Sequence, residues 1–196
     1  MMKGKTKMAT ILVDYENVVG TNGLKGVDAL QREDVFIIFY SSCCGKIRSE
    51  YMQEIKNSGC EFRIIKLKGT GKNALDFYIA TECGIASEKG EKQLAIISND
   101  KGYQAVMDFF EVRKETQDIQ VIRAGNVETA LTMLETAENT GRKEKLLNRM
   151  EMVELETEYT EWEKNKRWQE RKITKKQMPI LLGKEILHSI KHKRRI

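Results

Sequence analysis

Histidine is nearly absent from this sequence, and its placement excludes several kinds of catalytic site. The two histidines, His188 and His192, both lie close to the C-terminus of the 196-residue chain. The rest of the chain therefore has no imidazole for a Ser-His-Asp or Cys-His site, or for the acid-base chemistry of a histidine-dependent ribonuclease. If the protein is an enzyme, carboxylates must carry its chemistry.

Cysteine and proline are also scarce, and long hydrophobic runs are missing. The cysteines form neither a C-x-x-C pair nor a zinc-ligand spacing, which favours thiols in a reducing compartment: Cys43, Cys44, Cys60 and Cys83. The apolar run behind the basic start of the chain spans only about six residues, too short for a signal peptide or a membrane span. A single proline and 14 glycines argue against disorder. We expect a cytoplasmic protein that does not associate with membranes.

Charge is distributed unevenly along the chain. Residues 1–140 contain 18 Lys and Arg against 20 Asp and Glu, whereas residues 141–196 contain 16 basic residues against nine Glu. We therefore expect a domain over 1–140 and a basic α-helical extension over 141–196. A basic extension suits a polyanionic partner such as nucleic acid, although a charge run is more often the solvated face of a helix.

Short apolar runs alternate with helical patterns over the first 140 residues. Five runs rich in β-branched and aromatic residues predict buried strands over 9–13, 34–40, 61–67, 94–97 and 119–122. Helical spacing predicts helices over 47–58, 73–87, 104–112 and 127–137. The alternation predicts an α/β fold, a three-layer sandwich with a central, mainly parallel five-stranded sheet. The helix over 73–87 is so apolar that we expect it to be buried almost all round.

Three aspartates are predicted to converge at one edge of this sheet. Asp14 closes the first strand, Asp100 closes the fourth, and Asp76 lies in the first turn of the apolar helix. Right-handed crossovers place the ends of strands one and four on the same edge, where open α/β sheets bind ligands. Carboxylate oxygens suit Mg²⁺ or Mn²⁺, which can activate water and neutralise phosphate in an in-line displacement.

Each of these acids also has an ordinary structural explanation. Asp14 and Asp100 could be helix N-caps at strand ends. Asp76 could stabilise the N-terminus of its helix or pair with Lys72 one turn earlier. These explanations account for each acid singly, but they do not account for three acids at one edge. We therefore favour a metal-dependent phosphodiesterase.

Three stretches, in this order, resemble the successive motifs of the PIN-like nucleases, particularly their NYN branch. They are Asp14-Tyr15-Glu16-Asn17 after a strand, Asn73-Ala74-Leu75-Asp76 at a helix start, and Ser98-Asn99-Asp100-Lys101-Gly102-Tyr103 after a later strand. The resemblance covers residues 8–125. It implies a PIN-like fold with a sheet of order 3-2-1-4-5, and Mg²⁺- or Mn²⁺-dependent endonuclease activity, usually on single-stranded or structured RNA.

The resemblance also implies roles for individual residues. By motif position, the metal ligands and catalytic acids are Asp14, Asp76 and Asp100, with Asn17 as a further catalytic residue and Ser98 in support. We expect the substrate to be contacted by Ser98, Lys68, Lys72 and Lys101. One departure from the family pattern is Gly102, which stands where related proteins often have a second acid. A fourth ligand is then missing, or it comes from Glu16 or a water.

Three functions remain open from the sequence. The leading hypothesis is a Mg²⁺- or Mn²⁺-dependent endoribonuclease whose partner is RNA, with DNA as the other candidate substrate. Gly102 motivates a second hypothesis, a catalytically inactive PIN-like module for RNA binding or assembly. A third hypothesis, an aspartyl-phosphate enzyme with Asp14 as nucleophile, fits less well because such enzymes favour Asp-x-Asp and this chain has Asp14-Tyr15-Glu16.

Aromatic residues lie among cations in the C-terminal extension. Tyr159, Trp162 and Trp168 are surrounded by Lys164, Lys166, Arg167, Arg171 and Lys172. Aromatic rings between cations can stack on bases and hold a nucleic-acid backbone. An apolar helical stripe more often packs against the core or a second subunit, so a homo-oligomer formed through the C-terminal helices is a further expectation.

Overall fold

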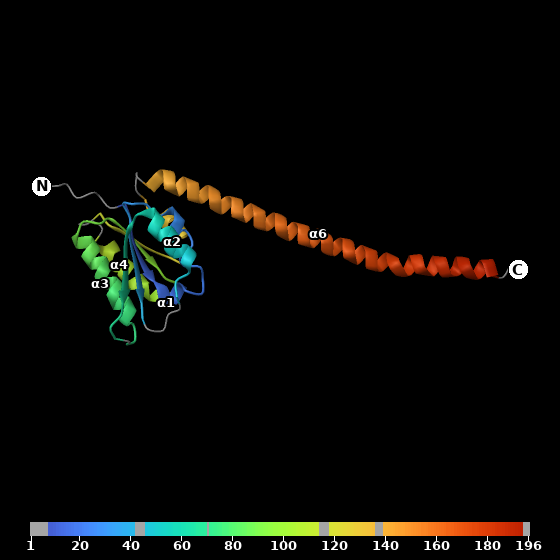
Figure 1. The fold of residues 1–196 in the computed structure, drawn as a ribbon, viewed down its shortest axis with the longest axis horizontal. Helices are drawn as coiled ribbons and strands as arrows, with labels where there is room; N and C mark the ends of the chain where they lie inside the picture. Colours follow the sequence, from blue (N-terminus) through green and yellow to red (C-terminus); the bar gives the residue numbers. More distant parts are fainter. Residues whose placement is uncertain (1–7, 42–45, 70, 114–117, 136–138, 194–196) are drawn as a thin grey trace. The chain divides into compact units, whose positions relative to one another are not determined.

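A computed structural model describes residues 8–41, 46–69, 71–113, 118–135 and 139–193, with side chains described as far as residue 168. The chain divides into two compact units, Met1–Leu147 and Asn148–Ile196. The first unit contains the whole sheet (Figure 1). Among the described residues, no helix has both the length and the apolar character that crossing a membrane requires.

Five parallel strands form the centre of the first unit. They are β1 (Thr10–Asp14), β2 (Val35–Tyr40), β3 (Glu61–Lys66), β4 (Gln93–Ile97) and β5 (Gln120–Ala124). Their order is β3-β2-β1-β4-β5, and every neighbouring pair is parallel. The predicted five-stranded sheet and the order implied by the family resemblance are both confirmed. Because β1 and β4 are adjacent and parallel, their C-terminal ends meet at one edge of the sheet.

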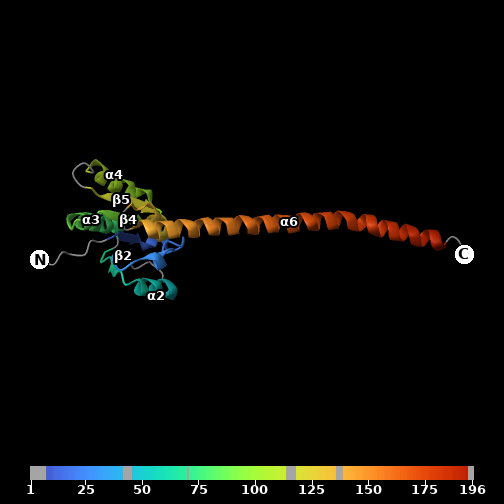
Figure 2. The same cartoon turned by 90° about the horizontal axis from the view of Figure 1, so that it is seen from above.

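Helices cover both faces of this sheet. The short elements are α1 (Tyr15–Val18), the 3₁₀ turns η1 (Val27–Ala29) and η2 (Lys101–Tyr103), and α5 (Val127–Met133); the longer ones are α2 (Ser49–Ser58), α3 (Ala74–Glu88), α4 (Gln104–Val112) and α6 (Thr140–Lys193). Two apolar clusters fill the space between the layers, one containing residues of α3 and α4 and the other containing residues of α2 and α5. Figures 1 and 2 show α3 and α4 close to each other beside the strands. The three-layer prediction is confirmed.

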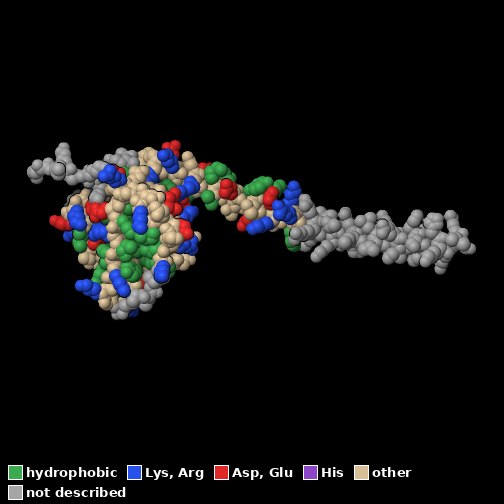
Figure 3. Space-filling view, in the orientation of Figure 1, with side chains coloured by type: hydrophobic (Ala, Val, Ile, Leu, Met, Phe, Trp, Pro, Cys, Tyr) green, Lys and Arg blue, Asp and Glu red, His purple; other side chains and the backbone are tan. Residues whose placement is uncertain are grey.

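Burial of α3 on all sides is not observed, and that prediction is wrong. Leu75, Ile79 and Cys83 face the sheet, but Phe77 is 68% exposed and Ile85 is 42% exposed. The helix is an outer layer of a three-layer sandwich, so only one of its faces can reach the core. Figure 3 shows hydrophobic side chains exposed on one face of this unit.

The described cysteines are free thiols, as expected. Cys60 is half-buried and Cys83 is buried. Burial raises the pKa of the Cys83 thiol to about 12, so it stays protonated and unreactive near neutral pH. Cys43 and Cys44 lie outside the described residues.

Candidate active site

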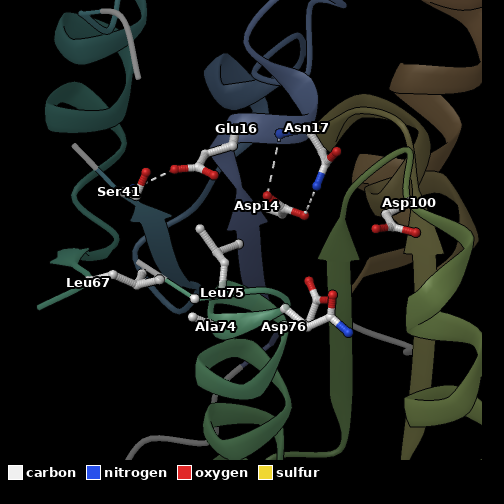
Figure 4. Close-up of a pocket in the computed structure, with 11 residues that line it drawn as sticks. Asp14, Glu16, Asn17, Ser41, Leu67, Ala74, Leu75, Asp76 and Asp100 are labelled. Carbon is white, nitrogen blue, oxygen red and sulfur yellow. Dashed lines mark hydrogen bonds between the residues drawn. The ribbon is translucent and has the colours of Figure 1, made fainter. Parts of the chain in front are cut away.

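The three predicted acids line one cavity at the C-terminal edge of the sheet. The cavity has a volume of about 310 Å³, and its walls come from the ends of β1 and β2, the start of α3 and the segment after β4. Its lining residues are Asp14, Glu16, Asn17, Ser41, Leu67, Gly71, Asn73, Ala74, Leu75, Asp76 and Asp100. Figure 4 shows Asp14, Asp76 and Asp100 approaching this space from three different elements. The predicted convergence of the acids is therefore present in the fold.

Asp14 is the most firmly held of the three acids. It ends the buried strand β1 and is 0% exposed. Its Oδ2 accepts hydrogen bonds from Asn17 Nδ2 at 2.6 Å, from Ser98 Oγ at 2.9 Å and from the Tyr103 hydroxyl at 3.1 Å. Its Oδ1 also accepts from the Asn17 backbone N–H, so Asp14 caps α1 as well. Several neutral donors on one carboxylate fix its orientation.

Asp100 is also a helix cap, and it is more accessible than Asp14. Its Oδ1 accepts a hydrogen bond from the Gly102 backbone N–H at 2.8 Å, which caps η2. Its own backbone N–H donates to Ser98 Oγ at 3.0 Å, so Ser98 links the two strand ends. The capping explanation is correct for Asp14 and for Asp100. Capping fixes each local turn, but it does not require the two carboxylates to line the same cavity.

Asp76 lies in the first turn of α3, where its charge is unfavourable. The helix follows a left-handed residue, Asn73, with a φ of 61°. Burial raises the pKa of Asp76, and the negative charges of Asp14 and Asp100 raise it further, while a hydrogen bond from Tyr103 opposes the shift. Within the described residues no ion pair joins Asp76 to Lys72, although such a pair was one structural explanation for this acid. The three carboxylates are thus electrostatically coupled.

Tyr103 is a site residue that the sequence reasoning did not single out. Its ring is 1% exposed, and its hydroxyl donates to Asp14 and also lies within hydrogen-bonding reach of Asp76. Burial and the two nearby carboxylates raise its pKa, so the hydroxyl keeps its proton. A buried tyrosine needs a partner for its hydroxyl, and Tyr103 follows Asp100 by one turn. The position of a tyrosine one turn after Asp100 could therefore have indicated from the sequence that Tyr103 belongs to the site.

The other predicted residues take different positions. Asn17 lines the cavity, whereas the Ser98 side chain is 0% exposed and donates to Asp14, so it supports that carboxylate from behind. Glu16 also lines the cavity, and its Oε1 accepts from the Ser41 backbone N–H at 2.9 Å. The predicted substrate lysines are exposed and are not among the lining residues: Lys68, Lys72 and Lys101.

The donor set suits a hard divalent cation, although the side chains do not form a closed cage. Among the residues that the structure describes, no group of three or more His, Cys, Asp or Glu side chains is close enough to hold one ion. Mg²⁺ usually keeps several waters and needs only one or two carboxylates. Asp14 and Asp76, which share the Tyr103 hydroxyl, fit that requirement, and Asp100 could join them through water.

Comparison with known proteins supports the fold and a general activity. A model of the PIN domain family matches residues 8–117, which is more than half of the chain. Comparison with curated proteins and with solved structures gave no match in either set. PIN domains are commonly nucleases and generally use divalent metals, so the match supports a nuclease-like function. With a five-stranded parallel sheet, the expected strand order and this match over 8–117, the chain belongs to the PIN domain family.

Proposed function

We propose that this protein is a Mg²⁺- or Mn²⁺-dependent endoribonuclease that hydrolyses phosphodiester bonds at the cavity between β1, β4 and α3. The observation that carries the proposal is the convergence of Asp14, Asp76 and Asp100 on one cavity, where burial raises the pKa of Asp76 and the charges of Asp14 and Asp100 add to that shift. Three carboxylates held close together without a cation repel one another. Such an arrangement is typical of a site that binds a cation.

The chain's own residues have distinct tasks in this proposal. Asp14 and Asp76 hold the ion, with Asp100 direct or through water, and a bound divalent ion supplies a polarised phosphate and an activated water. Asn17, Ser98 and Tyr103 keep Asp14 oriented by donating to it. The exposed lysines near the cavity attract the phosphate backbone, which positions it without reading bases: Lys68, Lys72 and Lys101.

RNA is the proposed substrate, and cleavage with defined metals tests the whole proposal. Labelled single-stranded RNA, hairpin RNA and single-stranded DNA are incubated with the full chain in Mg²⁺, Mn²⁺ or excess EDTA. We expect endonucleolytic cutting of RNA in Mg²⁺ or Mn²⁺, none in EDTA, and recovery when Mn²⁺ is restored. Cutting that persists in EDTA would contradict the metal requirement, and DNA cut faster than RNA would contradict the substrate.

A second candidate is a PIN-like module that binds RNA without cutting it. Gly102 and the lack of a closed ligand group among the described side chains favour this alternative. It predicts RNA binding whose affinity falls with added salt, on a negative log-log slope, and no cleavage with any divalent ion. The cleavage experiment therefore separates the two candidates directly.

Removing the charge of Asp76 should stabilise the metal-free protein. The pKa of Asp76 is raised above its ordinary value of 3.8. A raised folded-state pKa contributes stability that is fully present below the ordinary value and is lost as pH rises through the folded pKa. At neutral pH the ionised side chain is therefore unfavourable, and Asp76→Asn removes that charge. We expect Asp76→Asn to melt above the parent in EDTA near neutral pH, with the difference disappearing in acid.

The same variant should lose its response to metal. Saturating Mn²⁺, at about 100 times the dissociation constant, should stabilise the parent by about 2.7 kcal/mol and Asp76→Asn by much less. Asp108→Asn is the matched control, because Asp108 is exposed, lies outside the cavity and bonds only to Gln104 among the contacts described. Thermal melts with and without Mn²⁺ measure both effects. An Asp76→Asn protein less stable than the parent in EDTA would contradict the charge argument.

A further inference from the structure

A second, smaller hollow lies next to the candidate active site, at the short helix α1. Its volume is about 60 Å³, and its walls combine two tyrosines, several apolar side chains and two cations. The lining residues are Tyr15, Val18, Val19, Asn22, Gly23, Leu24, Lys46, Arg48 and Tyr51. Among the residues described around this hollow none is acidic, whereas four carboxylates line the active-site cavity. We call this hollow the tyrosine pocket.

Two parts of the chain connect the tyrosine pocket to the active-site cavity. In α1, Glu16 lines the cavity and Tyr15 lines the pocket; between β2 and α2, Ser41 lines the cavity and Lys46 lines the pocket. The Tyr15 hydroxyl donates to the Lys46 carbonyl at 3.4 Å, and the Ser41 N–H donates to Glu16, as Figure 4 shows. Because α1 has four residues, it rises by only about 6 Å, a distance that one nucleotide of extended RNA can span.

The tyrosine pocket contains the groups that bind an unpaired base and its phosphate. Tyr51 is half-buried, and the guanidinium carbon of Arg48 lies 5.9 Å from the centre of its ring. Lys46 and Arg48 are both exposed, so their charges can reach a phosphate outside the pocket. Unpaired bases stack on aromatic rings and on guanidinium planes, while lysine and arginine hold the backbone. The small volume limits the occupant to a single base.

We propose that the tyrosine pocket holds one unpaired base of the RNA, on a nucleotide next to the phosphodiester bond at the active site. This inference rests on the proposed function, because it adds a second contact to the same substrate. Lys46 and Arg48 attract the backbone beside a cavity whose acids repel it, and stacking on Arg48 and Tyr51 orients the strand across α1. A base within a duplex is paired and stacked, so the pocket selects unpaired nucleotides.

A purely structural role for Arg48 and Tyr51 is the competing explanation. A similar pair lies on α4, where the guanidinium carbon of Arg113 is 4.9 Å from the centre of the Phe109 ring. Neither Arg113 nor Phe109 lines the pocket or the active-site cavity. The two pairs each have one positive charge and one ring, but only Arg48 and Tyr51 lie beside a hollow that is connected to the active site. Arg113 and Phe109 are therefore the matched control.

The first test compares RNA binding by the two pairs. Arg48→Ala with Tyr51→Leu, and Arg113→Ala with Phe109→Leu, are each made in the full chain carrying Asp100→Asn, which is expected to bind RNA but cut it slowly. Fluorescence anisotropy measures the affinity for a labelled single-stranded RNA in Mn²⁺. We expect the first double variant to weaken binding at least about tenfold and the second less than about twofold. Equal losses would overturn the pocket as a binding site.

A single substitution guards against a loss of folding. Tyr51 packs partly against the core, and leucine keeps that apolar contact. Arg48 is exposed, so Arg48→Ala alone is expected to leave the melting curve unchanged and to weaken RNA binding at least about threefold. Arg113→Ala alone should weaken binding less than Arg48→Ala does. If Arg48→Ala binds RNA as tightly as its Asp100→Asn parent, the proposal is wrong.

The second test changes the RNA instead of the protein. An RNA strand in which every base is replaced by hydrogen is compared with the same strand retaining one central base. In the Asp100→Asn chain, the retained base should strengthen binding at least about fivefold, because the strand can slide until that base enters the pocket. The gain should fall below about twofold with Arg48→Ala and Tyr51→Leu, and persist with the control pair. A gain unchanged by the altered pocket would place the base elsewhere and overturn the proposal.

Cleavage of the single-base strand by the unaltered chain tests where the pocket lies relative to the active site. In Mn²⁺, cutting is expected at a phosphodiester bond next to the retained base, and cuts spread evenly along the strand would overturn that placement. The same data separate this inference from the proposed function. If no RNA is cut but the base still gains affinity through the pocket, the nuclease proposal fails and the pocket stands. If RNA is cut without that gain, the pocket alone fails.

Discussion

Asp100→Asn is expected to lower the rate of RNA cleavage by about a thousandfold while leaving the fold intact. A metal site contributes several kcal/mol of transition-state stabilisation, and each 1.4 kcal/mol corresponds to a factor of ten in rate. Asp100 is exposed, and its Oδ1 accepts from the Gly102 backbone N–H. An asparagine oxygen can accept the same hydrogen bond, so the cap of η2 survives while the charge is lost.

Asp14→Asn should lower the cleavage rate at least as much, but it also disturbs the structure. Three side chains donate to Asp14 Oδ2, and an amide NH₂ placed there would face donors instead of accepting from them. Asp100→Asn is therefore the decisive variant. The cleavage rate of Asp14→Asn is interpreted only together with its thermal stability, measured by a melting curve. Asp108→Asn is the control and should cut at the parent rate. If Asp100→Asn also cuts at that rate in Mn²⁺, the proposed site is wrong.

Strands and their order could be predicted because local and global signals agree. Each strand is a short run of apolar residues with polar residues or glycine at its ends, and a sheet buried on both faces requires such runs. The C-terminal ends of β1 and β4 and the start of α3 also carry the motif residues, so the sequence indicated at which edge of the sheet the three acids meet. The C-terminal positions of Asp14 and Asp100 follow from the parallel pairing of β1 with β4.

Side-chain environments were harder to predict than element positions. Composition alone suggested that α3 is buried all round, but an apolar residue can lie on an outer surface, as Phe77 does. Tyr103 supports Asp14 through a contact across more than 80 residues of sequence, whereas the supporting role of Ser98 was implied by the motif resemblance. Periodicity describes one segment at a time, so it carries no information about such contacts.

Arg142→Met is expected to destabilise the first unit by about 3–5 kcal/mol near neutral pH. Arg142 Nη1 donates to Asp34 Oδ2, and the two side chains are 3% and 0% exposed. Removing one partner of a buried ion pair leaves the other charge without compensation, which has a cost in this range. Urea denaturation measures it. Lys143→Met, the neighbouring substitution at a half-buried position, should change the free energy of unfolding by less than about 0.5 kcal/mol.

The pH dependence identifies the cause of that loss. Burial raises the pKa of Asp34, and Arg142 opposes the shift, so removing Arg142 should raise the pKa further. The stability linked to a raised pKa is complete below the ordinary value of 3.8 and is lost as pH rises through the folded pKa. The destabilisation by Arg142→Met should therefore be smaller near pH 4 than near pH 7. A loss of equal size at both values would show that lost packing, not the uncompensated charge, is responsible.

A double variant provides an independent way to distinguish the uncompensated charge of Asp34 from lost packing as the cause of the destabilisation. Asp34→Asn removes the buried charge but keeps an oxygen that can accept from the Gln31 backbone N–H, which donates to Asp34 at 2.8 Å. Asp34→Asn combined with Arg142→Met should therefore recover about half or more of the stability that Arg142→Met loses.

Because Arg142 and the buried Leu146 both lie beyond residue 140, a fragment ending at 140 should be less stable than one ending at 147. The first turns of α6 thus stabilise the sheet that carries the candidate active site.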